Sequence, residues 1–365
     1  MTTHFHTRLI SLDVFRGIIV ALMILVNSPG NHTAYVWLEH SVWNGFTLAD
    51  LVFPSFIFIV GVSLAISLSK AQEKHLSFQQ LFPKILIRTV VLFSVGLFLN
   101  AFPHHFDFGT LRVFGVLQRI AICYFIAATL FLTTRISTQA LIMLGLMIGY
   151  WLLMTRLSGV YDLSPKGNYA AFIDRHLFSS AHLYGKVFDP EGLLSTLPAI
   201  STALLGNLTG AWLNSSHSQN KKVMHLTLAG FFAVVAGWLW GLWFPINKAL
   251  WTSSYVLFAG GFSVLILALC YWLIEVKSLK KWSRPFEIFG LNAMLAYVLH
   301  VIFLKIQAAI SIPGPTGKTS NLRVFITEHL FGWASLENAS LFYAGCYTIL
   351  WLLIIWLFVI KKSKR

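Results

Sequence analysis

Ten apolar segments, each close to the length that crosses a lipid bilayer, divide this chain of 365 residues. They lie at 10–27, 46–69, 86–101, 113–133, 139–157, 193–213, 223–244, 253–275, 286–310 and 339–360. A helix of about 20 residues spans the roughly 30 Å of hydrocarbon in a bilayer. Because lipid offers the backbone no hydrogen-bonding partner, spanning segments fold as helices. The pattern predicts one all-α domain over residues 1–365, a polytopic membrane helix bundle of about ten transmembrane helices.

The composition fits a protein whose solvent is largely lipid. Charged residues make up 11% of the chain, whereas an average soluble domain carries about 25%. So few charges cannot cover the surface of a protein of this size in water. The net charge of +14 gathers in short clusters between apolar segments, such as 277–281 and 361–365. Such clusters anchor cytoplasmic loops, so they indicate contact with membrane lipid and not with nucleic acid.

The loops differ in their content of Lys and Arg. If the N-terminus is cytoplasmic, most of the 27 Lys and Arg residues fall in the inner segments. Because positively charged short loops stay in the cytoplasm, both the N- and C-termini are predicted to be cytoplasmic. The loops 28–45, 158–192 and 311–338 then face the opposite side. Neither an internal repeat nor a broken helix, both frequent in secondary transporters, is clear in the sequence.

Signatures of other protein classes are missing. Cys123, Cys270 and Cys346 all lie inside apolar segments, without metal-ligand spacing. We expect three buried small hydrophobic residues, no disulfide and no metal site. The chain also has no phosphate-binding Walker loop and no Gly-x-Ser-x-Gly motif. A multi-pass chain with short loops either moves a solute or carries out chemistry inside the bundle.

Polar residues inside apolar segments are functional hypotheses by default. Asp13 and Arg16 are three residues apart, so they share one face of the first segment and fit a pair that anchors it at the cytoplasmic edge. Asn27 closes the same segment and fits a helix cap or an interhelical hydrogen bond. Arg119 lies a turn or two into the fourth segment, where it must meet an anion. A carboxylate such as Asp107 or Asp50 fits this need, and so does a phosphate.

Residues 35–54 mix aromatic and polar side chains at a membrane boundary. Histidine is the only side chain whose unperturbed pKa, about 6.5, lies near neutrality, which suits His40 to proton transfer, although a boundary histidine is also commonly structural. Trp43, Asn44 and Asp50 fit stacking on a sugar and hydrogen bonding to it. Trp43 also fits an interfacial belt and Asp50 a helix cap, so both interpretations stay open.

Two further polar segments precede apolar ones. Asp189 and Glu191 come just before 193–213, where acidic residues favour the helix dipole or hold the hydroxyls or amine of a substrate. Lys248 lies in a similar segment before 253–275.

Taken together, these motifs resemble the heparan-alpha-glucosaminide N-acetyltransferase family of transmembrane acyltransferases. The matching stretches are 8–17, 43–54, 115–120, 189–196 and 247–255. The resemblance covers nearly the whole chain. Because the chain starts close to the first motif, we expect a bacterial member, multi-pass in the inner (plasma) membrane.

The resemblance implies that acetyl passes from cytoplasmic acetyl-CoA, the donor substrate, to the amine of a glucosamine-type sugar at the periplasmic side, without a metal. The family's catalytic histidine corresponds to His40, and an asparagine tied to catalysis corresponds to Asn27. Asp50 would orient His40 or bind the acceptor. Direct transfer and an acetyl-histidine intermediate both stay open. For the assembly, the resemblance points to a homodimer.

The family places CoA within the bundle, with its nucleotide toward the cytoplasm. We assign acetyl-CoA binding to four basic residues, Arg16, Lys84, Arg88 and Arg119. Arg119, together with Arg112, also fits a role in bracing Asp50. Substrate binding is assigned to Trp43, Asn44, Asp189, Glu191 and Lys248. The alternatives are an amino-sugar transporter and an O-acyltransferase of a cell-envelope glycan.

Overall fold

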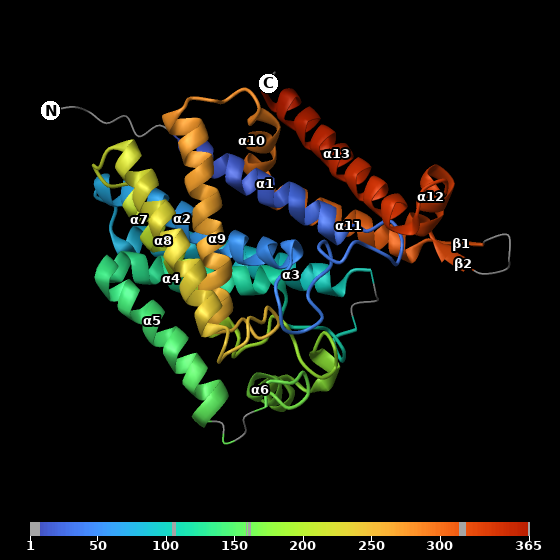
Figure 1. The fold of residues 1–365 in the computed structure, drawn as a ribbon, viewed down its shortest axis with the longest axis horizontal. Coiled ribbons are helices and arrows are strands. Elements are labelled where there is room, and N and C mark those ends of the chain that lie inside the picture. Colours follow the sequence, from blue (N-terminus) through green and yellow to red (C-terminus); the bar gives the residue numbers. More distant parts are fainter. Residues whose placement is uncertain (1–7, 104–106, 158, 160–161, 314–318, 364–365) are drawn as a thin grey trace.

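Helices make up nearly all of the regular structure of this protein (Figure 1). The computed structural model describes residues 8–103, 107–157, 159, 162–313 and 319–363. The helices are α1 (Ile10–Asn27), α2 (Leu48–Glu73), α3 (Phe78–Ala101), α4 (Val116–Thr133), α5 (Ile136–Leu152), α6 (Tyr169–Phe178), α7 (Thr196–Leu213), α8 (Gln219–Trp240), α9 (Ser253–Tyr271), α10 (Arg284–Leu291), α11 (Ala293–Ala309), α12 (Leu322–Phe331) and α13 (Leu336–Ser363). Short π-helical turns extend α5 (Leu153–Leu157) and α9 (Trp272–Val276), and a 3₁₀ turn follows α6 (Ser180–His182). Strands β1 (Ser311–Pro313) and β2 (Thr319–Asn321) pair antiparallel.

The predicted all-α, polytopic membrane bundle is confirmed. Within the described ranges, eight helices are long and apolar enough to cross a membrane, or nine if the bent pair α10–α11 is one span. The one predicted segment outside this set is 193–213, which contains α7. It is helical but carries the buried polar residues Ser201, Thr202 and Asn207. Because the number of crossings depends on α7, the cytoplasmic location of both termini stays a prediction.

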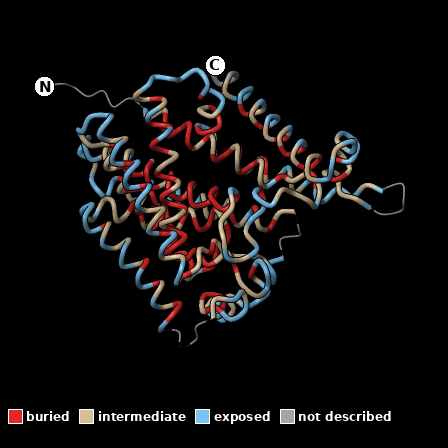
Figure 2. Tube along the Cα trace, viewed as in Figure 1, coloured by how far each residue is buried: buried red, intermediate tan, exposed pale blue. Residues whose placement is uncertain are grey.

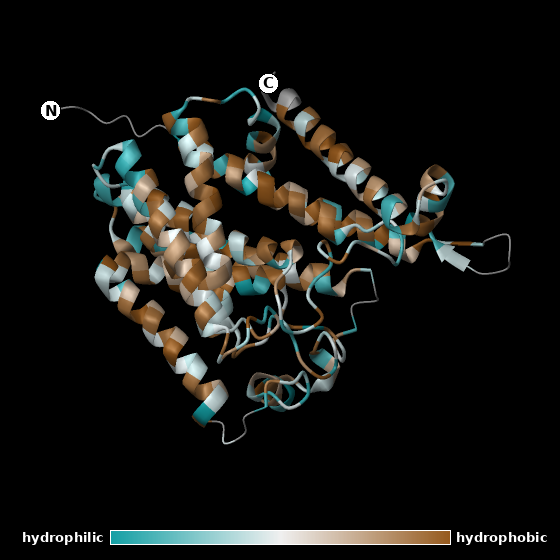
Figure 3. Ribbon diagram, in the orientation of Figure 1, coloured by the Kyte–Doolittle hydropathy of each residue, from teal (hydrophilic) through white to brown (hydrophobic). Residues whose placement is uncertain are grey.

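The outer surface of the bundle is apolar, as lipid requires. Figure 2 shows buried residues gathered toward the middle of the bundle, and Figure 3 shows that the outer helices are rich in hydrophobic residues. Exposed hydrophobic side chains lie on α5 (Leu141), α8 (Phe231, Trp238) and α13 (Leu353, Trp356). Such a surface would associate in water, so its natural contact is the bilayer.

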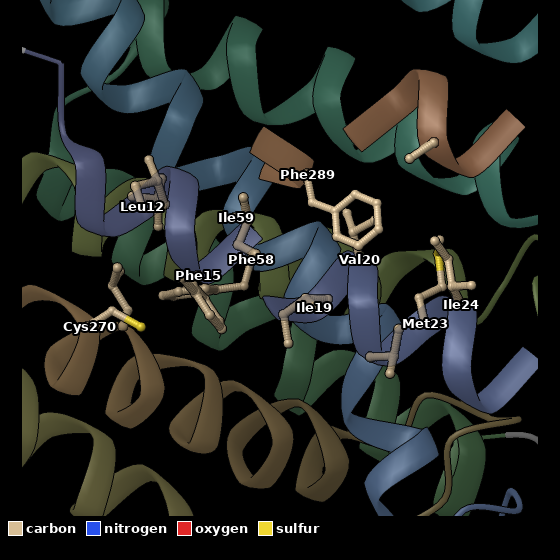
Figure 4. Packing of buried hydrophobic residues seen from close by; sticks show 14 of the residues in the cluster. Leu12, Phe15, Ile19, Val20, Met23, Ile24, Phe58, Ile59, Cys270 and Phe289 are labelled. Carbon is tan, nitrogen blue, oxygen red and sulfur yellow. The ribbon is translucent and has the colours of Figure 1, made fainter. Parts of the chain in front are cut away.

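Helix α1 packs against α2, α9, α10 and α13 at the centre of the largest hydrophobic cluster. Phe15 of α1 meets Phe58 of α2 with ring centroids 6.4 Å apart, and α10 adds Phe289 to the cluster (Figure 4). A Cβ atom at Gly17 would lie 1.7 Å from the carbonyl oxygen of Phe286, so the backbones of α1 and α10 touch at this glycine. Such close contact through small residues is how helices associate where lipid removes the hydrophobic drive.

The segment 286–310, predicted as one span, consists of two helices in the structure. The axes of α10 and α11 differ by 80° across the break at Asn292. The Asn292 backbone N–H donates to the carbonyl oxygen of Phe289 (3.1 Å), and its side chain donates to that of Ile288 (3.0 Å), which ends α10. The Asn292 carbonyl oxygen then accepts from the Ala296 N–H (2.9 Å) and starts α11. One asparagine thus caps two helices.

The cysteines follow the sequence prediction in two of three cases. Cys123 and Cys270 are buried, and all three thiols are free. Cys346 is exposed, so its predicted burial was wrong. It lies on the peripheral helix α13, where one face packs on the bundle and the other does not.

Candidate active site

A cavity of about 770 Å³ lies among α1, α2, α3, α4 and the α10–α11 bend. Ligand pockets in proteins measure about 300–1,000 Å³, so this cavity can hold a large cofactor-sized molecule. Its wall includes both Arg16 and Asn27 of α1, which are about 16 Å apart along the helix at 1.5 Å per residue. Ser63 and Arg88 line the wall near Arg16, and His40, Glu191 and Lys248 form a second polar group on the wall. The cavity therefore joins two polar regions through an apolar middle.

His40, which lines the cavity, forms a pair with Asp50. His40 Nδ1 lies 2.9 Å from Asp50 Oδ1, and the histidine side chain is 51% exposed whereas that of Asp50 is fully buried. Since a carboxylate only accepts hydrogen bonds, Nδ1 carries the hydrogen of the neutral ring. Nε2 is then the nitrogen with a free lone pair, which can take a proton or attack a carbonyl carbon.

The start of α2 explains why Asp50 is in place. Its Oδ2 accepts from the backbone N–H groups of Ser41 and Thr47, both at 3.1 Å, and Thr47 is the N-cap of a capping box. Tyr255 of α9 donates to the Asp50 carbonyl oxygen at 2.7 Å. Asp50 therefore both caps α2 and holds the ring of His40. Tyr255 was not foreseen from the sequence, because nothing in the local pattern joins α9 to the start of α2.

Lys248 lies beside this pair. Its Nζ is 3.0 Å from Nδ1 and 3.1 Å from Nε2 of His40, and 3.6 Å from Asp50 Oδ1. Burial lowers the pKa of Lys248, because it removes the ammonium group from water, while Asp50 and Glu191 oppose this shift. The two carboxylates favour the charged form of the lysine.

Trp43 and Asn44 lie behind this cluster and do not line the cavity. Asn44 Oδ1 accepts from Asn247 Nδ2 at 3.0 Å, and the Gly45 N–H donates to the Ile246 carbonyl oxygen at 2.9 Å. The Trp43 indole donates to the Leu163 carbonyl oxygen at 2.8 Å. The first two bonds dock the segment that carries Lys248 against residues 44 and 45. Their geometry favours support of the site over direct contact with a sugar.

Arg112 holds the two acidic residues of the loop before α7. Its guanidinium donates to both oxygens of Asp189, at 2.7 and 2.5 Å, and also to Glu191. Burial opposes the charge of Arg112, but Asp189 and Glu191 outweigh it and raise the arginine pKa. Glu191 lines the cavity, whereas Asp189 lies behind it. Arg112 thus braces these carboxylates and not Asp50, a pairing that sequence reasoning missed because 77 residues separate Arg112 from Asp189.

Arg119 is fully buried but does not line the cavity, against its assignment to acetyl-CoA. It donates to the Gly192 carbonyl oxygen at 3.1 Å and to the Ser195 hydroxyl, and its guanidinium carbon lies 5.0 Å from the Trp251 ring centroid. Neither carboxylate expected from the sequence hydrogen-bonds to it within the described ranges. Arg119 instead fixes the loop that presents Glu191.

Of the three basic residues assigned to the cytoplasmic part of the acetyl-CoA site, two line the cavity and one does not. Arg16 donates to Asp13 (2.9 Å), to the Gly290 carbonyl oxygen (3.2 Å) and to Ser63 (2.6 Å). Arg88 lines the cavity with its guanidinium carbon 4.8 Å from the Tyr124 ring centroid. Lys84 is exposed and does not line the cavity, so its position does not support a role in acetyl-CoA binding.

Fold and site together define a multi-pass membrane protein with a deep cavity and a histidine–carboxylate pair at one end of it. A model of the family described as heparan-alpha-glucosaminide N-acetyltransferase, catalytic, matches residues 8–241. The chain is 31% identical over 361 residues to the human (Homo sapiens) heparan-alpha-glucosaminide N-acetyltransferase, covering 81% of this chain and 53% of the relative. The mouse (Mus musculus) protein of the same name is 31% identical over 360 residues with the same coverage. This chain therefore belongs to the heparan-alpha-glucosaminide N-acetyltransferase family, as the sequence motifs predicted.

The chain spans about half the length of the curated relatives that it matches. The family model includes Arg16, His40, Asp50 and Glu191 but ends before Lys248 and the α10–α11 bend.

Proposed function

We propose that this protein is a transmembrane acetyltransferase that moves acetyl from cytoplasmic acetyl-CoA to the amine of a glucosamine-type sugar at the periplasmic side of a bacterial inner membrane. The observation that carries the proposal is the single cavity whose wall includes Arg16 and Arg88 as well as Asn27 and His40. Arg16 and Asn27 are about 16 Å apart along α1, so a donor bound along the cavity would extend from the basic region toward the residues proposed for catalysis.

Arg16, Arg88 and Ser63 are the groups for the phosphates of CoA. Guanidinium groups suit phosphate because several of their N–H donors form charge-assisted bonds in parallel. Arg88 has no carboxylate partner within the described ranges, so its charge is available to an anion. The apolar middle of the cavity would then enclose the thiol-bearing arm of the donor, with the thioester toward His40.

At the thioester, His40 Nε2 acts as the base. The neutral amine attacks the carbonyl carbon, a C–N bond forms and the C–S bond breaks. The amine proton passes to Nε2 and then to the departing CoA thiolate. Asn27 would donate a hydrogen bond to the carbonyl oxygen as negative charge develops there, which in a protease is worth roughly 3–4 kcal/mol. In the two-step alternative, Nε2 itself takes the acetyl group before the amine attacks.

Glu191 is the group for the acceptor, since its carboxylate lines the cavity beside Lys248. Asp189 supports Glu191, because both carboxylates bind Arg112. Asn44 supports the site through its bond to Asn247, and Trp43 through its bond to Leu163. A homodimer remains a prediction from the family resemblance, which light scattering in detergent would test.

The direct test compares wild type with His40→Ala in an assay with acetyl-CoA and glucosamine. General-base catalysis is worth about 10²–10⁴-fold, so the variant should lose at least about 100-fold in rate. His75→Ala is the matched control, because His75 is an exposed histidine outside the cavity. An undiminished rate in His40→Ala would remove this residue from the chemistry. Labelled acetyl-CoA without acceptor would trap an acetyl-enzyme only on the two-step route.

The bend between α10 and α11 favours a second candidate, an amino-sugar transporter. Broken helices line the substrate sites of many secondary transporters, and Gly290, Leu291 and Ala293 at this bend line the cavity. Uptake of labelled glucosamine into proteoliposomes without acetyl-CoA would support transport. If acetyl-CoA is consumed, mass spectrometry of the product separates the amide of an N-acetyltransferase from the ester of an O-acyltransferase.

A further inference from the structure

The two tyrosines of the cavity wall differ from other buried tyrosines of the bundle. Tyr150, Tyr255 and Tyr347 donate their hydroxyls to backbone carbonyl oxygens at 2.6, 2.7 and 3.0 Å. Tyr124 of α4 and Tyr297 of α11 line the cavity, and within the described ranges their hydroxyls form no hydrogen bond. Because a buried tyrosine hydroxyl usually finds a partner, a ligand in the cavity is the natural partner for these two.

The two tyrosines belong to different polar regions of the cavity. Tyr124 lies in the basic region, where the Arg88 guanidinium carbon is 4.8 Å from its ring centroid. The Tyr297 hydroxyl instead interacts electrostatically with the charges of Glu191 and Arg112. Tyr297 is therefore on the side of the cavity where the acceptor is proposed to bind. It also lies beyond residue 241, where the match to the family model ends.

We propose that Tyr297 is a further acceptor-binding residue, whose hydroxyl forms a hydrogen bond with one hydroxyl of the amino sugar while Glu191 holds another polar group of the same sugar. This inference rests on the proposed function for the class of acceptor. Arg112 occupies Oε2 of Glu191, and Oε1 accepts no hydrogen bond within the described part of the chain. A carboxylate oxygen only accepts, whereas a phenol both donates and accepts, so the two groups together match a ligand with several hydroxyls.

The fold holds Tyr297 in a fixed place on the cavity wall. The break at Asn292 starts α11 about one turn before it. About one turn after it, the His300 ring packs edge-on at 5.7 Å between centroids, and the Tyr347 hydroxyl donates to the His300 carbonyl oxygen at 3.0 Å. Further along α11, Lys305 Nζ donates to two carbonyl oxygens at the end of α3, at 2.6 and 2.7 Å. A side chain on a helix fixed at both ends loses little freedom on binding, which suits it to orient a sugar.

Tyr297→Phe tests the inference, because it removes one oxygen and keeps the ring against His300. We expect the KM for glucosamine to rise roughly 2- to 10-fold, as for loss of one neutral hydrogen bond, while the KM for acetyl-CoA stays at the wild-type value. Tyr271→Phe is the matched control, since Tyr271 is a buried tyrosine of α9 outside the cavity wall. Deoxyglucosamines that each lack one hydroxyl identify the contact. One of them should bind equally well to wild type and to Tyr297→Phe, because the bond is already missing.

Equilibrium binding of radiolabelled glucosamine without acetyl-CoA separates this inference from the proposed function. Weaker binding to Tyr297→Phe in a protein that transfers no acetyl would support the inference and remove the acetyltransferase. Normal acetyl transfer with an unchanged KM for glucosamine in Tyr297→Phe would overturn the inference and leave the acetyltransferase in place.

Two further results would overturn the inference. One is the absence of glucosamine binding to the wild type. The other is a rise in the KM for acetyl-CoA alone, which would assign Tyr297 to the donor. If Tyr297→Phe does not yield a monodisperse protein, Tyr297→Met replaces it with the same expectation.

Discussion

The two polar regions of the cavity balance their charges differently. Around His40, each carboxylate has a positive or ionisable partner: Asp50 has His40 and Lys248, and Glu191 has Arg112. Around Arg16, basic groups are in excess, since Asp13 is shared by Arg8 and Arg16. Arg88 adds another positive charge, with the Tyr124 ring as its partner. A balanced network suits proton transfer, in which charges change during the reaction, whereas an excess of positive charge suits a permanent anion such as phosphate.

The largest effect on the rate of acetyl transfer should come from removing the negative charge of Asp50. Asp50→Asn keeps the size of the side chain but can present an amide N–H₂ to Nδ1, which would leave Nε2 with the hydrogen. We expect acetyl transfer to fall by about 100-fold or more, comparable to loss of the base itself. The assay uses saturating acetyl-CoA and glucosamine. Asp107→Asn is the control, since Asp107 is exposed and bonds only to Gly109 and Thr110 within the described ranges. Equal losses in both variants would point to misfolding and not to the ring orientation.

The next effect concerns stability. Arg112→Met leaves Asp189 and Glu191 without their shared cation, and removing one partner of a buried ion pair costs about 3–5 kcal/mol. We expect a clear drop in the thermal midpoint in detergent at pH 7. The drop should shrink at low pH, where the carboxyl groups can be protonated and their burial costs less. A destabilisation that does not depend on pH would mean that packing, and not charge, is what Arg112 contributes.

The basic region around Arg16 and Arg88 should affect the binding of acetyl-CoA more than the rate of acetyl transfer. Arg88→Gln should raise the KM for acetyl-CoA about 10-fold or more, because a charge-assisted hydrogen bond is worth about 1.5–3 kcal/mol. An acetylated pantetheine without the nucleotide phosphates should lose little. Lys84→Gln is the matched control on the same helix, since Lys84 is exposed and lies outside the cavity wall. If Lys84→Gln gives the larger increase in KM, the region that binds phosphate has been misassigned.

Features that depend on residues close together in the sequence could be predicted, whereas contacts between distant residues could not. The bounds of α1 and the general order of helices come from apolar runs, which are local. The pairing of His40 with Asp50, ten residues apart, is within reach of sequence reasoning because Thr47 and Asp50 mark a helix start. The bend at Asn292 was not foreseen, since the apolar pattern continues through it.

The partners of the buried arginines also lay beyond the sequence. Arg112 and Arg119 both meet the loop around residues 189–195, which is more than 70 residues away along the chain. Hydrophobic periodicity says only that a buried cation needs a partner. Which partner it finds depends on how α3, α4 and α7 pack, and that packing follows from the whole bundle.

Asp174, unlike the carboxylates of Asp50 and Glu191, has no positively charged salt-bridge partner within the described ranges. Its substitution gives the smallest predicted effect. Asp174 is buried and accepts from the Leu193 N–H at 2.9 Å. Burial raises the pKa of Asp174 to about 6 from its usual value of 3.8. The folded protein therefore binds a proton that the unfolded chain releases between about pH 4 and pH 6, and stability falls as the pH rises through this window.

Asp174→Asn keeps an acceptor for Leu193 and removes the charge. At pH 7 the free energy of unfolding should rise by about 1–2 kcal/mol, and its fall between pH 4 and pH 6 should become shallower. Unfolding in detergent at pH 4.5 and pH 7 measures both. Arg119 is the nearby cation that favours the ionised form, and its Nε and Nη1 have no hydrogen-bond partner within the described ranges. If the variant loses stability at pH 7, the Asp174 charge is compensating Arg119 across the loop, and the balance found around His40 extends to this carboxylate as well.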